Sequence, residues 1–298
     1  MEGALHQSVL AKEVMAYLAP RPGNIIVDAT VGMGGHSALI LEAITPKGNL
    51  IGIDRDDRSL DQARRQLHPF KNSFVLIQDN FDNLTNILKG LSVNEIDGIL
   101  FDLGLSSFQL EDAVRGFSFL REGPLDMRMD LRQHATAKDL VNRLPEKGLD
   151  HLIWEFGEER WHRRIAQRIA KARKRAPITT TTQLAELVTR AIPHATSFRI
   201  HPATRTFLAL RIAVNQELEA LDRAIRQAIH FLKDGARIVV ISFHSLEDRI
   251  VKHRFREWAR EKRLILVTKK PILPSSSEIQ NNPRARSAKL RCAEKSSP

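Results

Sequence analysis

The chain has little of the chemistry that marks secreted, metal-bound or membrane-spanning proteins. Its 298 residues include one cysteine, Cys292, which excludes an internal disulfide bond and a zinc site built from several cysteines. Such low cysteine use suits a reducing compartment, and we expect a cytoplasmic protein. No apolar run approaches the roughly 20 residues that cross a bilayer. The first twenty residues carry Glu2, Lys12 and Glu13 instead of the apolar core of a signal peptide.

Metal ligands and aromatic residues are also sparse. The histidines, among them His6, His151, His162 and His194, show no spacing typical of metal ligands, so we expect no bound transition metal. Aromatic residues make up 6% of the chain, but its hydrophobic content of 42% is enough for a sizeable core. A chain of this length forms one large domain or two ordinary ones.

Positive charge, by contrast, is abundant and concentrated. The net charge is +11, yet residues 249–298 alone carry +10 and residues 160–175 carry +8, so the remaining residues sum to −7. Either segment alone could be a solvated face, but two of them favour a polyanionic partner, namely a nucleic acid. A membrane-surface helix at residues 160–175 is a weaker alternative, because its apolar stripe is narrow.

Short apolar runs alternate with helical stretches over residues 1–110, which predicts an α/β fold with a parallel sheet covered by helices on both faces. The predicted strands are Asn24–Asp28, Leu50–Asp54, Ser73–Gln78, Asp97–Asp102 and, after a long gap, Ala236–Phe243 and Leu264–Thr268.

The gap between the two groups of strands has helical periodicity and little strand signal. We predict an inserted all-helical, substrate-recognition domain at residues 113–205, which separates a first part of the α/β domain (1–112) from a second part (206–298). A single long helix, Thr206–Leu232, should lead back to the sheet. After Pro271 the composition predicts a basic, partly mobile tail.

A glycine-rich turn follows the first predicted strand, in the sequence Val27-Asp28-Ala29-Thr30-Val31-Gly32-Met33-Gly34-Gly35-His36. A strand, a tight glycine turn and a helix start place unpaired backbone N–H groups where the polar tail of a ligand can lie. Asp54 ends the second strand, about 20 residues downstream, where a carboxylate can bind ribose hydroxyls. The pattern predicts a cofactor that contains adenosine.

The third and fourth strands also end in acidic residues, Asp79 and Asp102, and the ring of Phe81 could stack on adenine. Because ligands of parallel sheets bind beyond the carboxyl ends of the strands, we expect Asp28, Asp54, Asp79 and Asp102 to converge.

The loop favours S-adenosylmethionine over a nicotinamide cofactor. The third small position of the nicotinamide fingerprint is a serine here, Ser37. Asp28 would repel a pyrophosphate, whereas its carboxylate suits the ammonium group of a methionine tail.

At the level of whole motifs the chain resembles the bacterial 16S ribosomal RNA cytosine-N4 methyltransferase family. The matching segments span the chain: 6–10, 28–37, 54–56, 101–109, 115–119, 123–130, 201–205, 242–249 and 282–291. One departure is Glu111, where the family more often has aspartate.

The resemblance implies a Rossmann-like, S-adenosylmethionine-dependent methyltransferase sheet with an inserted helical domain. It also implies methylation of the N4 amine of cytosine 1402 in the decoding centre of 16S rRNA, within the small subunit or its late assembly intermediate. The cofactor-binding residues that it implies are Gly34, Gly35, His36, Asp54, Phe81, Asp102 and Gln109.

Candidate RNA contacts come from the charge pattern and the matched motifs. They are Arg115, Arg128, His201, Arg205, His244 and Arg249, for each of which a structural ion pair or helix cap is an equal alternative.

Asp102 is the candidate general base, and holding the amine of the cofactor is its alternative role. The segment after it, Leu103-Gly104-Leu105-Ser106-Ser107, lacks the Pro-Pro-aromatic motif of many amino-group methyltransferases. Two other functions remain possible from the sequence: an NAD-linked oxidoreductase, which the loop disfavours, and a non-catalytic RNA-binding or ribosome-assembly factor.

Overall fold

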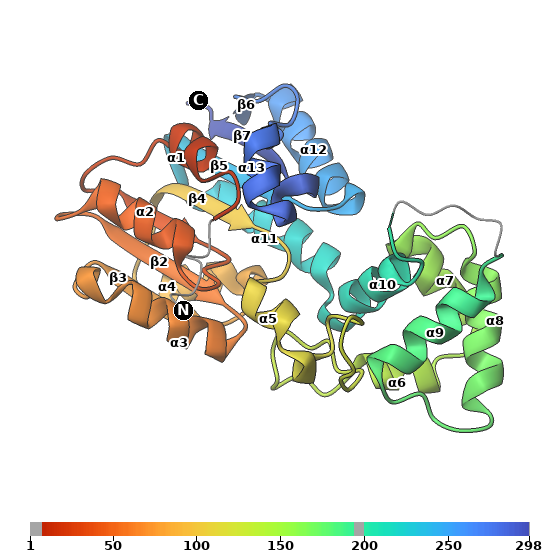
Figure 1. Ribbon diagram of the computed structural model, residues 1–298. Coiled ribbons are helices and arrows are strands. Elements are labelled where there is room, and N and C mark those ends of the chain that lie inside the picture. The colour runs from red at the N-terminus through yellow and green to blue at the C-terminus, as the bar shows by residue number, and fades with distance from the viewer. Residues whose placement is uncertain (1–7, 194–199, 298) are drawn as a thin grey trace. The chain divides into compact units, whose positions relative to one another are not determined.

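The computed structural model describes residues 8–193 and 200–297, and these form two compact units (Figure 1). The first unit comprises Met1–Gly104 and Leu218–Pro298, and the second comprises Leu105–Glu217. The predicted insertion, residues 113–205, lies inside the second unit. His6, Gln7 and His194 fall outside the described residues.

The first unit is built on a seven-stranded sheet with the order β3-β2-β1-β4-β5-β7-β6. Strands β1 to β5 run parallel, whereas β7 runs antiparallel to both β5 and β6. The strands are β1 (Ile25–Asp28), β2 (Asn49–Asp54), β3 (Phe74–Gln78), β4 (Ile96–Asp102), β5 (Leu232–Ser242), β6 (Leu264–Leu266) and β7 (Lys289–Lys295). The α/β fold and the six predicted strands are therefore confirmed, with small shifts at their ends.

Helices cover both faces of this sheet because neighbouring strand residues alternate between two apolar cores. Val27 and Ile51 pack with α4, α11 and α12, while Ile26 and Leu50 pack with α1 and α2. The helices of this part are α1 (Ala11–Leu18), α2 (Gly35–Ile44), α3 (Asp57–Gln66), α4 (Leu84–Gly90), α11 (Glu217–Phe231), α12 (Ser245–Arg260) and α13 (Ser276–Asn281).

The predicted mobile tail is wrong, because the chain after Pro271 returns to the sheet as β7. Leu290 and Cys292 are fully buried in the core beneath α1 and α2. The charged residues of β7 are paired: Arg291 Nε donates to Asp248 Oδ1 at 2.6 Å, and Glu294 accepts from Arg237 Nε at 2.9 Å. These pairs allow a basic, polar sequence to form an inner strand.

The second unit consists of helices around one apolar core. They are α5 (Ser107–Glu111), α6 (Ala137–Arg143), α7 (Glu146–Gly157), α8 (His162–Arg173), α9 (Thr181–Ala191) and α10 (Thr204–Asn215). Ile165 and Ile169 of α8 are buried in this core and Trp161 packs against it, as the amphipathic pattern predicts.

The predicted continuous helix Thr206–Leu232 is wrong. It is two helices, α10 and α11, separated at Gln216, whose φ of 50° ends α10 in the left-handed conformation. Buried Asn215 fixes this break, because its side chain accepts from Met129 N at 2.8 Å and donates to Met127 O at 2.8 Å. The apolar periodicity runs through the break, since both helices have a buried face.

Within the described ranges, no helix is long and apolar enough to span a membrane.

Candidate cofactor and substrate site

The loop between β1 and α2 takes backbone conformations that favour glycine. Gly32 and Gly34 have φ values of 54° and 90°, and α2 begins at Gly35. A Cβ at Gly34 would lie 3.3 Å from the Cα of Ala63, and one at Gly35 would lie 2.2 Å from Ser8 Oγ. The glycines therefore allow both the turn and the close packing around it.

Asp28, at the end of β1, holds this loop in shape. Its Oδ2 accepts a hydrogen bond from Ser37 Oγ at 2.6 Å, and its Oδ1 accepts one from Thr30 N at 3.1 Å. Burial raises the pKa of Asp28, although the hydrogen bond from Ser37 acts in the opposite direction. Each oxygen keeps a second lone pair, so the predicted contact of Asp28 with the ammonium group of a methionine tail stays a prediction.

Asp54, at the end of β2, is fixed from two sides. Its Oδ2 accepts from Gly32 N at 2.8 Å and its Oδ1 accepts from Asp56 N at 2.9 Å. Burial raises the pKa of Asp54 to about 6, although these two backbone hydrogen bonds favour the charged form. Each oxygen keeps a second lone pair, so the carboxylate can also accept a hydrogen bond from a ligand hydroxyl.

His36 and Asp102 form a buried pair where α2 begins and β4 ends. His36 Nε2 lies 3.4 Å from Asp102 Oδ2, and His36 is 5% exposed. Burial alone would lower the pKa of His36, but Asp102 and then Asp28 outweigh it and raise that pKa. Asp102 Oδ1 has no hydrogen-bond partner among the described residues. A buried carboxylate oxygen without a partner is costly, and a bound donor would satisfy it.

Phe81 follows β3 and contacts two other side chains. Its ring meets that of Phe101 edge-on, with centroids 5.7 Å apart, and the guanidinium carbon of Arg55 lies 5.3 Å from its centroid. Asn80 Oδ1 accepts from Arg55 Nη2 at 2.7 Å, while Asp79 accepts from Asn80 N. These contacts fix the aromatic ring beside the strand ends.

The acidic ends of β1, β2 and β4, that is Asp28, Asp54 and Asp102, are named here the carboxylate edge. The sheet order reverses between β1 and β4, and ligands of open α/β sheets bind at such a switch point. Asp102 N donates to Thr30 Oγ1 at 2.6 Å, which ties the end of β4 to the glycine loop. The structure therefore brings together all the proposed cofactor residues of the first unit.

Gln109 belongs to the second unit. It lies in the first turn of α5, where its Oε1 accepts from Ser106 N at 3.1 Å and its own N–H donates to Ser106 Oγ at 3.2 Å. Through this capping box Gln109 stabilises the N-terminus of α5. Its role in cofactor binding stays a prediction.

Two of the proposed RNA contacts, Arg115 and Arg128, support a loop. Arg115 is 2% exposed and its Nη2 donates to the carbonyls of Arg128 and Met129, each at 2.9 Å. Arg128 binds both carboxylate oxygens of Asp126 and donates to Gln133 O at 2.6 Å. Arg115 is therefore buried within this loop, whereas Arg128 is half-buried and its contact with RNA stays a prediction.

His201 and Arg205, in contrast, are exposed. The ring of His201 lies against that of Phe119, with centroids 4.6 Å apart, and Arg205 Nη1 donates to Glu158 O at 2.9 Å. Both side chains remain accessible to a ligand, so their contact with RNA stays a prediction.

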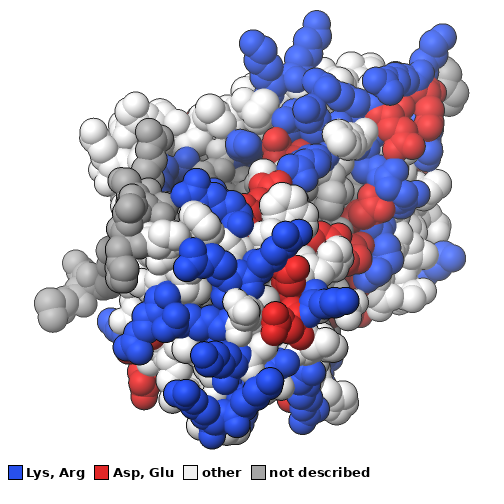
Figure 2. Space-filling view, turned by 90° about the vertical axis from the view of Figure 1, so that its right-hand side faces the viewer, with Lys and Arg blue, Asp and Glu red and all other residues white. Residues whose placement is uncertain are grey.

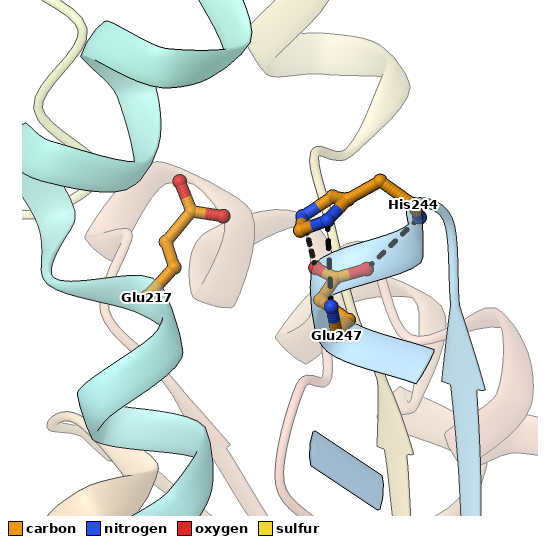
Figure 3. Close-up of side chains that lie close together, drawn as sticks. All are labelled: Glu217, His244 and Glu247. Atoms are coloured by element: carbon orange, nitrogen blue, oxygen red, sulfur yellow. Dashed lines mark hydrogen bonds and ion pairs between the residues drawn. The ribbon is translucent and has the colours of Figure 1, made fainter. Parts of the chain in front are cut away.

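His244 directly precedes α12, and Arg249 lies near the start of that helix. His244 is the helix N-cap: its Nδ1 accepts from Glu247 N at 3.5 Å, and its Nε2 lies 3.1 Å from Glu247 Oε1 (Figure 3). The Glu247 side chain in turn accepts from Phe243 N at 2.8 Å. His244 thus has the capping role, whereas Arg249 is exposed on the helix.

Comparison with known proteins decides the class. The MraW methylase family model matches residues 3–296. The chain belongs to the MraW methylase family. It is 52% identical to the ribosomal RNA small subunit methyltransferase H of Trichlorobacter lovleyi, over 99% of each chain. It is 50% identical to the protein of that name from Geobacter sulfurreducens, over 97% of this chain and 98% of the relative.

A solved rRNA methylase from Streptococcus thermophilus aligns with this methylase with a TM-score of 0.44 and 11% identity, over 99% of this chain and 100% of the other. Family membership confirms the predicted class, a methyltransferase that uses S-adenosylmethionine. The carboxylate edge fits that cofactor, because it offers a glycine turn, a fixed carboxylate on Asp54 and an unpartnered oxygen on Asp102.

Two residues that shape this methylase's site were missed in the sequence. Thr30 joins the glycine loop to β4, and Arg55 lies against the ring of Phe81. Arg55 directly follows the strand-end Asp54, so a search for partners of Phe81 at the strand ends could have found it. Nothing in the sequence indicates that the Thr30 hydroxyl accepts a hydrogen bond from a different strand.

Proposed function

We propose that this methylase transfers a methyl group from S-adenosylmethionine to the exocyclic N4 amine of the decoding-centre cytosine of 16S rRNA, within the small subunit or a late assembly intermediate. The names of its relatives support an RNA acceptor in the small subunit. The two basic segments support a polyanionic substrate. Such an acceptor would place the activity in the cytoplasm.

Different residues at and around the carboxylate edge would bind different parts of the cofactor. The backbone of Gly34 and Gly35, with His36, would hold the amino-acid tail, and Asp54 would accept hydrogen bonds from the ribose hydroxyls. The ring of Phe81 would pack against adenine. When bound, S-adenosylmethionine supplies an electrophilic methyl group, so the protein must supply alignment more than acid–base power.

Asp102 carries the chemical part of the proposal. The cytosine amine is a poor nucleophile because its lone pair is delocalised into the ring. An oxygen that accepts a hydrogen bond from this amine would localise the lone pair as the new bond forms. Asp102 Oδ1 is suited to that task because it lies at the strand-order switch point and has no partner among the described residues. The target base must also be unpaired or leave its stack.

The proposal is tested with isotope-labelled S-adenosylmethionine, isolated small subunits and naked 16S rRNA. We expect label in the RNA of the particle, and nucleoside digestion followed by mass spectrometry should yield N4-methylcytidine. A non-catalytic assembly factor would bind the particle and transfer no label. Label in any other nucleoside would overturn the assignment of the acceptor.

A further inference from the structure

Helix α8 and the residues that follow it carry a stripe of positive charge. Arg164, Arg168, Lys171 and Arg175 recur at intervals of four, three and four residues, which places the helical members on one face, about 6 Å or less apart along the axis. All four are exposed. Figure 2 looks onto the side of the molecule that carries α8, and its lower half shows Lys and Arg side chains gathered with few acidic ones.

This stripe forms one wall of a groove between α8 and α9. The groove has a volume of about 610 Å³, and Arg190 of α9 adds a fifth cation to its lining. Its apolar lining residues are Ala172, Leu187 and Ala191. Among the described residues, none that lines the groove is acidic. We call this feature the α8–α9 groove.

Most of the positive charge in the α8–α9 groove is not neutralised. Arg190 pairs with Glu186 at 3.1 Å. Within residues 8–193 and 200–297, Arg168, Lys171 and Arg175 form no ion pair. Like charges on one helix face repel each other, so this arrangement costs stability until an anionic partner relieves it.

The lining indicates which part of a nucleic acid would bind. Proteins that bind single strands combine cations with aromatic rings on which bases stack, and none of the described residues that line this groove is aromatic. Its polar groups are instead guanidinium and ammonium donors, which match phosphate oxygens. The groove is therefore suited to the sugar–phosphate backbone of a helical segment, with little preference for sequence.

We propose that the α8–α9 groove binds the phosphate backbone of a double-helical segment of the acceptor RNA. This inference rests on the proposed function only in taking RNA as the acceptor. The contact is made by the second unit alone, whereas the carboxylate edge belongs to the first unit. Substrate binding by the groove and methyl transfer are therefore separable.

The test compares two double variants that remove the same charge from the same helical segment. Arg168→Gln with Lys171→Gln removes two cations of the groove. Arg163→Gln with Lys174→Gln removes two exposed cations outside its lining and is the matched control. Fluorescence anisotropy with a labelled RNA duplex, without cofactor, gives Kd over a range of salt concentrations for both variants and the parent protein.

We expect the groove variant to bind the duplex about tenfold more weakly, with a salt slope lower by about two, and the control to stay within about twofold of the parent. Equal losses in both variants, or no loss in either, would overturn the proposal. So would loss of binding to anionic phospholipid vesicles with duplex binding unchanged, because the groove would then be a membrane contact. Unfolding curves should show that all three proteins are folded and that the groove variant is at least as stable as the parent protein.

A second measurement separates this proposal from the proposed function. With small subunits as substrate, the groove variant should show a raised KM for the particle, an unchanged kcat and an unchanged thermal shift with S-adenosylmethionine. If the parent protein transfers no label to the particle, the proposed function fails, yet the duplex comparison still decides the groove. A fall in kcat without a change in KM would contradict a docking role.

Discussion

The carboxylate edge and the α8–α9 groove use charge in opposite ways. At the edge, Asp28 accepts a hydrogen bond from Ser37 of α2, Asp54 accepts one from Gly32 of the glycine loop, and His36 lies against Asp102. In the groove, four arginines and Lys171 are exposed to solvent on α8, just after it and on α9. A fixed, buried set of acceptors suits one small ligand in one pose, whereas exposed cations suit an extended polyanion whose position along them can vary.

The difference predicts different sensitivities. Binding at the edge should depend on single atoms and on pH, and should respond weakly to salt, because buried groups are poorly screened. Binding in the groove should depend on salt and on the number of cations, and should be insensitive to pH between about 5 and 8 because arginine and lysine stay charged.

The largest effect should come from truncation after Pro274. The sequence assigns this basic segment to RNA binding, but it contains β7, which pairs with β5 and β6 inside the sheet of the first unit. We expect the truncated chain to lose its cooperative unfolding transition, as measured by circular dichroism and limited proteolysis. A truncated chain that folds and binds S-adenosylmethionine would show that β7 is dispensable.

A substitution that keeps the fold isolates the charge of this segment. Arg286 is exposed, so Arg286→Gln should leave unfolding unchanged and weaken duplex binding by a few-fold at most. A large loss would show that the segment after Pro274 is a main RNA contact in addition to the α8–α9 groove.

The second effect concerns Asp102. Asp102→Asn keeps the size of the side chain and removes its charge. If Asp102 acts on the amine, kcat should fall by about 10²- to 10⁴-fold while the Kd for S-adenosylmethionine changes little. If it only holds the cofactor, the Kd should rise and kcat at saturation should survive. Single-turnover methyl transfer and calorimetric titration together distinguish the two roles.

The carboxylate edge was largely predictable because each of its acids directly follows an apolar run that predicts a strand. Parallel strands bring their carboxyl ends to one edge, so residues that end apolar runs, such as Asp54 and Asp102, must meet there. The hydrogen-bond partners of each acid were not predictable. Ser37, Thr30 and Gly32 reach these acids only because of the folded conformation of the glycine loop, which the sequence does not specify residue by residue. The hydrogen bonds that Ser37 and Thr30 donate to Asp28 are the clearest example.

The missed elements share a different cause. Strand β7 alternates Leu290 and Cys292 with charged residues whose partners, Asp248 and Arg237, lie far away in the sequence. The break at Gln216 depends on hydrogen bonds between Asn215 and a loop more than eighty residues earlier. Composition and periodicity describe neighbours along the chain, so they do not predict hydrogen bonds or ion pairs between residues that are far apart in the sequence.

The third effect tests the glycine loop with a matched substitution. Gly34→Ala places a side chain at φ 90°, with its Cβ 3.3 Å from Ala63 Cα, and should cost about 1–2 kcal/mol of unfolding free energy. Gly90→Ala meets no atom within 4 Å at the end of α4, and should be neutral or stabilising by about 0.4–1 kcal/mol. Urea unfolding measures both. Equal effects would show that the loop conformation is not specified by Gly34.

The smallest effect is the pH dependence of cofactor binding, and it separates the two regions most directly. Burial raises the pKa of Asp54 to about 6 in the free protein. Ribose hydroxyls that donate to this carboxylate would favour its charged form, so binding should lower that pKa and release a proton. Affinity for S-adenosylmethionine should therefore be constant above about pH 7 and fall up to tenfold per pH unit below pH 6.

Asp54→Asn is the control for this titration, since an amide does not ionise. It should bind the cofactor more weakly at pH 8 and lose most of the decline below pH 6. Duplex RNA binding, measured in the same buffers at constant ionic strength, should stay level over this range because none of the described lining residues of the groove is of a type that titrates there. A parallel fall of both affinities would mean that acid changes the fold and not the charge of one carboxylate. A flat cofactor profile in the parent protein would show that Asp54 is already ionised in the free site, and that its pairing with ribose gains nothing from proton release.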